Sequence, residues 1–149
     1  MFAHTAPPSA DSNNSTTRLW IVRDFTYLSV MTVYFEDVAP VFPVGDLEAS
    51  MDHYRELGFT VHAHSDIYAY AVRGGVTVHL ALVSGMEPLR SNSVAYILVE
   101  DAEALAEEWG EADVDGEIGA PSPTEYGAIE GSYTDPDGNM LRFGSPQPD

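Results

Sequence analysis

The sequence contains no cysteine, no lysine and no long hydrophobic run. The absence of cysteine excludes disulfides, thiolate metal ligands and cysteine nucleophiles, and it is typical of a reducing compartment. No stretch approaches the ~20 apolar residues that a membrane-spanning helix needs. The first apolar runs also start too late for a secretory signal and lack its basic lead. These absences predict a cytoplasmic protein.

Positive charge is scarce as well. The basic residues are six arginines, against 24 Asp and Glu, which gives a formal net charge of −18. The charges of residues 1–31 cancel, so the whole excess lies on residues 32–149. Such a surface repels nucleic acid and anionic membranes and attracts a cationic ligand at long range. Adaptation to a halophilic cytoplasm would give the same acidity, so both explanations stay open.

One pattern occurs twice in the chain, 55 residues apart. The residues VGDLEA around Asp46 recur as VEDAEA around Asp101, and a large aromatic, Tyr54 or Trp109, follows each Asp by eight positions. Each copy predicts a strand, an Asp N-cap and an amphipathic helix. A repeat of this length indicates two similar modules in one chain.

The first module reads as strand, helix and three strands. Its first strand, Val41–Val44, contains Pro43 and follows Pro40, which predicts an edge or exchanged strand. Gly58 ends the helix that Asp46 caps. Period-two patterns predict the other strands, the last two joined by a tight Gly-Gly turn: Phe59–His64, Ile67–Arg73 and Val76–Val83.

The second module repeats this order. A strand at Val94–Val99 precedes a helix that runs from Asp101 to Gly110, and the stretch from there to Gly127 is rich in loop residues. Asp-Pro-Asp-Gly-Asn at 135–139 predicts a hairpin turn between the last two strands, Ala128–Thr134 and Met140–Gly144. We therefore expect an α+β fold of tandem βαβββ modules that form a cupped mixed sheet across a pseudo-twofold axis.

The two modules are expected at about residues 38–84 and 93–145, within a single domain over residues 32–149. Residues 1–17 are rich in Ser, Thr, Asn, Pro and Ala and have no periodicity, which predicts disorder. Residues 18–31 have no counterpart in the repeat. Residues 1–31 are therefore predicted to be a disordered or loosely ordered leader.

The tandem βαβββ order, the paired Asp caps and the Asp-Pro-Asp-Gly-Asn hairpin together resemble the vicinal oxygen chelate superfamily. This superfamily includes glyoxalase I, ring-cleaving dioxygenases and bleomycin resistance proteins. The resemblance covers about residues 38–145. The runs APVFPVGD at 39–46 and PTEYG at 123–127, followed by Glu130, are most similar to the bleomycin resistance branch. Ile129 and Gly131 stand where that branch has Arg and Phe.

The resemblance implies four metal-ligand positions, which fall here on Ala39, His79, Val94 and Arg142. Only His79 offers a lone pair, and the permanent cation of Arg142 repels a metal ion. We therefore expect neither a metal nor another cofactor, and we assign no catalytic residue.

His62 and His64 share one face of a predicted strand, which is metal-ligand spacing in some β folds. An exposed polar face is the alternative interpretation of this pair, and it is favoured. His79 is expected to line a cavity as a neutral hydrogen-bonding group. His53 is expected on a helix surface, and His4 lies in the leader.

Drug-binding members of the branch exchange N-terminal strands in a homodimer and form clefts lined with aromatic and acidic groups. Pro40 matches the base of the exchanged strand. His62 and Ala63 replace an Asp and a Phe that contact the ligand in the branch, and Leu98 replaces an aromatic. The residues expected to bind a ligand are His62, Tyr68, His79, Tyr96, Leu98, Tyr126 and Arg142.

The predicted function is that of a non-enzymatic homodimer that sequesters a cationic aromatic ligand, as in antibiotic resistance, with bleomycin-type molecules among the candidates. Stacking and cation–π contacts would supply affinity, and the negative field would speed capture. Two alternatives stay open: a metal-dependent glyoxalase- or dioxygenase-type enzyme of the same superfamily, and a ligand-free interaction module.

Overall fold

The computed structural model describes residues 33–149 of the chain. Residues 38–149 form one compact unit, and the helices and strands of the described residues belong to it. Residues 33–40 have no helix or strand. The predicted leader, residues 1–31, lies outside the described residues, as does His4.

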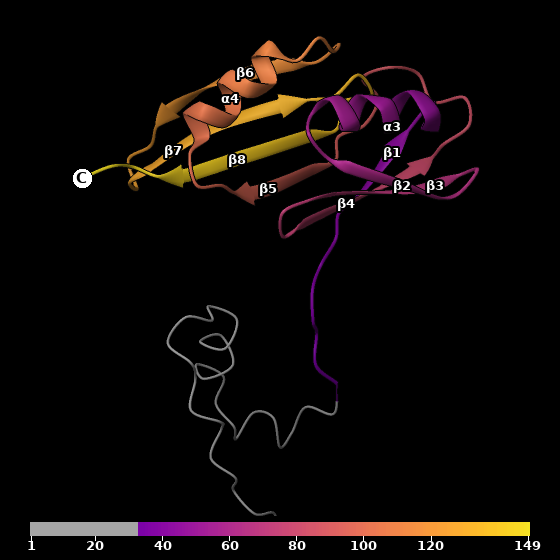
Figure 1. Cartoon of the computed structure of the whole chain (residues 1–149), viewed down its shortest axis with the longest axis horizontal. Coiled ribbons are helices and arrows are strands. Elements are labelled where there is room, and N and C mark those ends of the chain that lie inside the picture. Colours follow the sequence, from indigo (N-terminus) through magenta and orange to yellow (C-terminus); the bar gives the residue numbers. More distant parts are fainter. Residues whose placement is uncertain (1–32) are drawn as a thin grey trace, which may run out of the picture. The chain divides into compact units, whose positions relative to one another are not determined.

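The compact unit of residues 38–149 repeats one order of elements, strand, helix and three strands. The first module contains β1 (Val41–Val44), α3 (Leu47–Glu56), β2 (Thr60–Ser65), β3 (Tyr68–Arg73) and β4 (Val76–Leu82). The second contains β5 (Val94–Leu98), α4 (Ala102–Glu111), β6 (Glu117–Pro123), β7 (Ala128–Thr134) and β8 (Met140–Pro146). The predicted α+β fold of tandem βαβββ modules is confirmed, and each module forms its own mixed four-stranded sheet (Figure 1).

The two sheets have the same strand order, β1-β4-β3-β2 and β5-β8-β7-β6. β1 runs parallel to β4, with Val41 opposite His79, and β5 runs parallel to β8, with Val94 opposite Met140. The remaining pairs are antiparallel. β1 is an edge strand, as its prolines predict, because an edge position spares one side of the backbone from hydrogen bonding.

Each helix begins where the sequence predicts. The carboxylates of Asp46 and Asp101 accept hydrogen bonds, both at 3.0 Å, from the backbone N–H groups of Ala49 and Ala104. Both are N-caps that satisfy a backbone donor otherwise left without a partner. Gly58 follows α3 with φ +84°, as a helix-ending glycine does. α4 ends later than predicted, at Glu111.

The helices pack one apolar face on their own sheet, and the modules meet in a common core. Tyr54 of α3 and Trp109 of α4, the two aromatics of the repeat, are 1% and 3% exposed. The Trp109 indole Nε1 donates a 3.1 Å hydrogen bond to the carbonyl of Leu57, which joins α4 to the C-terminal end of α3 in the first module. Figure 1 shows α3 lying over the first sheet and α4 over the second.

β6 corrects the prediction that the stretch before Gly127 is loop. Its sequence, EIGAPSP, lacks alternating apolar residues and includes Pro121 and Pro123. The strand forms because it occupies the edge of the second sheet, where it pairs only with β7 and tolerates proline. Its register shifts between Gly119 and Ser122, which is a bulge or irregularity in the pairing.

His53 corrects a second prediction. The ring lies under α3, 9% exposed, and not on the helix surface. Its Nε2 is 2.8 Å from the hydroxyl of Tyr133, a residue of the second module. Burial lowers the pKa of His53, and the carboxylates of Asp135, Asp115 and Asp137 oppose that shift. The histidine therefore helps to join the modules, and helical spacing alone did not reveal this partner.

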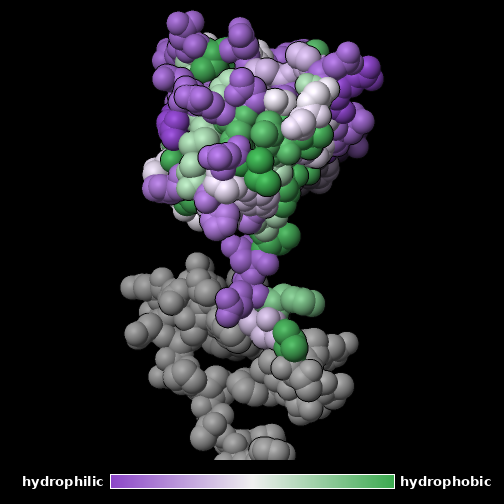
Figure 2. All heavy atoms as spheres, turned by 90° about the vertical axis from the view of Figure 1, so that its right-hand side faces the viewer, coloured by the Kyte–Doolittle hydropathy of each residue, from purple (hydrophilic) through white to green (hydrophobic). Residues whose placement is uncertain are grey.

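None of the helices of the described residues is long and apolar enough to cross a membrane. Apolar side chains nevertheless remain at the surface. Figure 2 shows the folded unit from the side on which α3 and β1–β4 lie in Figure 1, with hydrophobic residues gathered in the middle of the face and hydrophilic residues around them.

Candidate ligand-binding faces

The second sheet has one face that α4 does not cover. Because side chains alternate along a strand, residues paired across neighbouring strands share a face. One row across this sheet consists of Tyr96, Arg142, Ser132 and Gly119, and the next consists of Leu98, Gly144, Glu130 and Ser122. We call these residues, together with Val94 of β5 and Tyr126 of the β6–β7 turn, the second face.

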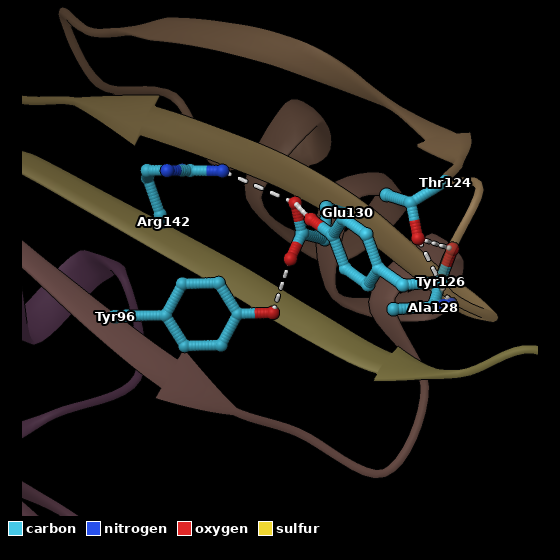
Figure 3. Close-up of polar contacts among 6 residues, drawn as sticks. All are labelled: Tyr96, Thr124, Tyr126, Ala128, Glu130 and Arg142. Atoms are coloured by element: carbon cyan, nitrogen blue, oxygen red, sulfur yellow. Dashed lines mark hydrogen bonds and ion pairs between the residues drawn. The ribbon is translucent and has the colours of Figure 1, made fainter.

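Glu130 is the centre of the second face. Its carboxylate accepts hydrogen bonds at 2.6 Å from the hydroxyls of both Tyr96 and Tyr126, one on each oxygen. Arg142 Nη2 donates to the same carboxylate at 3.1 Å (Figure 3). The side chain of Glu130 is 13% exposed although it stands on an uncovered sheet. Charge-assisted bonds of this length are strong and fix the orientation of both phenol rings.

The hydrogen bonds also set the protonation of this cluster. Donation from Tyr126 and Tyr96, with a smaller contribution from Arg142, lowers the pKa of Glu130. The hydrogen bond to Glu130 raises the pKa of both tyrosines. Glu130 is therefore a carboxylate and the tyrosines are phenols at neutral pH, so the cluster contains one anion, one cation and two neutral rings.

The two rings are fixed but accessible. Tyr96 is 47% exposed and Tyr126 is 72% exposed. The Arg142 guanidinium carbon lies 5.7 Å from the centre of the Tyr96 ring, within cation–π range. Gly144 makes room for this arrangement, because a Cβ there would overlap the Tyr96 hydroxyl. The second face can therefore stack an aromatic ligand.

The first sheet has a corresponding uncovered face, which we define as Val41, His62, Tyr68, Tyr70 and His79. His62, Tyr70, His79 and Val41 form one row across the strands. The Tyr68 hydroxyl lies 2.9 Å from His79 Nδ1. The Tyr70 ring is 4.7 Å from the His79 ring and 5.7 Å from the Tyr68 ring, centre to centre. This first face is an aromatic surface edged with imidazoles.

The residues at the superfamily's metal positions do not fit a metal ion. Ala39 and Val94 have no donor atom, Arg142 is a cation paired with Glu130, and His79 Nδ1 is engaged by Tyr68. Residues 33–149 contain no group of three or more His, Cys, Asp or Glu placed to hold a metal. We therefore assign no reaction step to a metal at these positions.

The structure places the seven predicted ligand-binding residues on these two faces. Tyr96, Leu98, Tyr126 and Arg142 lie on the second face, and Leu98 is 82% exposed. His62, Tyr68 and His79 lie on the first. Whether each one binds a ligand stays a prediction.

Sequence reasoning did not identify several members of these faces, of which Tyr70 and Glu130 make the main side-chain contacts. Tyr70 could have been found, because it follows Tyr68 by two residues on a strand and must share its face. Glu130 was visible only as part of the branch's motif. Nothing local in the sequence indicates that it would accept hydrogen bonds from residues 34, 4 and 12 positions away.

Comparison with known families agrees with this architecture. Residues 36–143 match the model of the glyoxalase/bleomycin resistance protein/dioxygenase superfamily. The chain belongs to this superfamily. No curated protein matches the sequence.

Solved structures with the same fold include bleomycin-related proteins. A bleomycin resistance determinant encoded on the transposon Tn5 is 20% identical, with a TM-score of 0.68 over 76% of this chain and 100% of that one. The bleomycin-binding protein of Streptomyces verticillus, solved with copper(II)-bleomycin, is 25% identical, with a TM-score of 0.66 over 79% and 100%. A glyoxalase-related enzyme from Clostridium phytofermentans is 22% identical, with a TM-score of 0.63 over 77% and 98%.

Proposed function

We propose that this protein binds a cationic, planar aromatic small molecule without turnover, as a cytoplasmic homodimer of the bleomycin resistance type. The observation that carries the proposal is the pair of exposed phenol rings, Tyr96 and Tyr126, held by a single carboxylate. A planar ligand gains stacking and cation–π contact on such rings. Copper(II)-bleomycin in the structure of the Streptomyces verticillus protein provides a precedent for a ligand.

The charge of the chain supports a cationic ligand. Each of the four arginines in the described residues lies in an ion pair, with Asp52, Glu108, Glu87 and Glu130 as the partners. The many remaining carboxylates leave a negative field that would raise the rate at which a cation arrives. The field contributes less to affinity as salt is added, because the screening length falls to ~8 Å at physiological ionic strength.

A homodimer would convert two open faces into a cleft. In the single chain both faces are uncovered, and β1 and β5 are edge strands. These edges display apolar side chains, since Val41 is 49% exposed and Val94 is 56% exposed. We place the first face of one copy opposite the second face of the other, with the segment around Pro40 exchanged or tightly paired. Each cleft would then combine Tyr68 and Tyr70 with Tyr96 and Tyr126.

Titration calorimetry tests the binding proposal. Purified full-length protein is titrated with copper(II)-bleomycin and, separately, with the planar cation proflavine. We expect at least one of the two ligands to bind with a stoichiometry of one per subunit, and to bind equally well to protein that was treated with EDTA beforehand. The bound ligand should be recovered chemically unchanged. Failure of both to bind would favour an interaction module. Conversion of more than one equivalent of ligand into product per subunit would favour the enzyme alternative, as would binding that requires metal to be added to the EDTA-treated protein.

A further inference from the structure

Arg142 has hydrogen-bonding capacity that Glu130 does not use. A guanidinium carries five N–H donors in a planar fork. Glu130 takes one contact, from Nη2, and among the described residues Nε and Nη1 have no hydrogen-bond partner. The side chain is 49% exposed on the second face. Arg142 is therefore anchored at one nitrogen and open at the other two.

A small polar cavity adjoins this guanidinium. It has a volume of about 260 Å³ and is lined by Arg142, Glu130 and short residues of β6 and β7, among them Ser122 and Ser132. Neither serine hydroxyl has a hydrogen-bond partner among residues 33–149, so both can donate to a ligand. The cavity and the stacking rings are neighbours, because Tyr96, Arg142 and Ser132 form one row across the sheet.

The floor of the cavity is kept low by glycine. Gly119 lies opposite Ser132, and a Cβ at residue 119 would overlap the Ser132 hydroxyl. The irregular pairing between Gly119 and Ser122 widens this part of the edge strand. The lining is mostly polar, with Ala120 as an apolar member and with the Glu130 carboxylate already paired with Arg142. The remaining N–H and O–H donors of Arg142, Ser122 and Ser132 suit an oxyanion.

We infer that this cavity binds a carboxylate of the ligand, so the ligand is a zwitterion with a planar cationic ring system and an anionic arm. The inference rests on the proposed function, since it specifies the chemistry of a molecule stacked on Tyr96 and Tyr126. The planar fork of arginine matches a carboxylate and can bind it through two parallel hydrogen bonds. Ser132 lies beside Arg142 to supply a third donor.

Glu130 directs the anion to the far side of Arg142. Its own charge is spread over three donors, Tyr96, Tyr126 and Arg142. A second carboxylate on the edge of the guanidinium that faces Glu130 would be repelled, whereas one on the other edge accepts hydrogen bonds from the N–H groups that Glu130 leaves free. The negative charge of the whole chain favours a cation at long range, so any preference for a carboxylate must come from short-range contacts with Arg142 and its neighbours.

A matched dye pair separates these effects. One probe is a rhodamine with a free carboxylate, which is a zwitterion, and the other is its methyl ester, which is a cation with the same rings. Fluorescence anisotropy at physiological ionic strength gives a dissociation constant for each dye with the full-length protein. We expect the free acid to bind about tenfold more tightly than the ester, the ratio that corresponds to ~1.4 kcal/mol for one charge-assisted interaction.

Variants assign the preference to Arg142. Arg142→Gln should reduce the ratio of the two affinities to about one or invert it, whatever happens to the absolute values. Arg142→Lys should retain part of the ratio, because the charge stays and the fork is lost. Arg90→Gln, which removes the same charge from an exposed pair with Glu87, should leave the ratio unchanged.

The outcomes separate this inference from the proposed function. If both dyes bind equally to the wild type, or if Arg142→Gln keeps the ratio, the carboxylate site is wrong and the stacking site stands. If none of the four molecules binds (the two rhodamine dyes, proflavine and copper(II)-bleomycin), the proposed function itself is wrong. If the acid alone binds and the Arg142→Gln variant loses it, both proposals are supported.

Discussion

The carboxylate of Asp137 in the second module accepts a 2.9 Å hydrogen bond from the backbone N–H of Gly45 in the first, 92 residues away. The same carboxylate accepts a second bond, at 3.3 Å, from the hydroxyl of Ser50. Two residues further on, the Asn139 amide donates at 2.9 Å to the carbonyl of Pro43. The Asp-Pro-Asp-Gly-Asn turn therefore does more than reverse the chain, because it fastens the last hairpin to the start of α3.

Loss of the Asp137 carboxylate should destabilise the whole unit. Asp137→Ala leaves the Gly45 N–H without its acceptor, and we expect a loss of ~1–3 kcal/mol in the free energy of unfolding. Asp137→Asn, which keeps one acceptor oxygen, should lose less. Asp66→Ala, at an exposed turn residue, is the control and should change stability little. Urea unfolding measures all three, and equal stability of Asp137→Ala and Asp66→Ala would contradict the prediction.

His53 should make stability depend on pH. Burial lowers its pKa below the ordinary value of 6.5, so the unfolded chain takes up a proton more readily than the folded one. Stability contributed by neutral His53 is present above pH 6.5 and is lost as the pH falls toward the folded pKa. Relative to His53→Gln, the wild type should lose stability between about pH 7.5 and 5.5. A wild-type-to-variant difference that stays constant over this range would refute the assignment.

The tyrosines of the second face should control dissociation. Tyr126→Ala removes a stacking ring, and we expect the bound ligand to leave roughly tenfold faster, which corresponds to ~1.4 kcal/mol of lost contact. Tyr68→Ala on the first face should act in the same direction if the cleft joins both faces. Added salt should instead lower the association rate, because it screens the long-range field. Stopped-flow fluorescence with proflavine separates the two rates, and a Tyr126→Ala effect confined to association would count against stacking.

Gly144 should matter for binding more than for folding. A Cβ at residue 144 would overlap the Tyr96 hydroxyl, so Gly144→Ala should displace that ring from Glu130 and weaken ligand binding. The overlap is mainly with the hydroxyl end of the Tyr96 side chain, so the protein should still fold. Gly75→Ala is the control, because nothing lies within 4 Å of a Cβ there. Calorimetry should show weaker binding for Gly144→Ala only, and unchanged affinity would mean that the position of the Tyr96 hydroxyl is unimportant.

The homodimer should depend on apolar residues before the first strand. Phe35 is 85% exposed in the single chain, and a second copy would bury it if the segment around Pro40 is exchanged. Phe35→Ser should shift the mass in light scattering from dimer toward monomer at micromolar concentration. Ile67→Ser removes an apolar residue that is 62% exposed at another place and should leave the dimer intact. A monomeric wild type would contradict both the dimer and the shared cleft.

The repeat explains why so much of the fold could be predicted from the sequence. Asp46 and Asp101 fixed both helix starts, and alternating apolar residues located all but one strand. β6 was not predicted as a strand because an edge strand needs little alternation of apolar residues and tolerates proline. The surroundings of His53 and Glu130 were not predicted for another reason. His53 contacts Tyr133, 80 residues away, and the most distant partner of Glu130 is Tyr96, 34 residues away. Local periodicity carries no information on such tertiary pairs.

The shared carboxylate of Glu130 has a thermodynamic consequence. Both phenol hydroxyls donate to it, so two exposed rings are already restrained before any ligand arrives. Ordering a free side chain at a binding site typically costs ~0.5–1.5 kcal/mol, and here that loss of conformational entropy has occurred during folding. Ligand binding at the second face should therefore show a smaller entropic penalty than the exposure of its rings suggests, and Glu130→Ala should restore that penalty for both tyrosines at once.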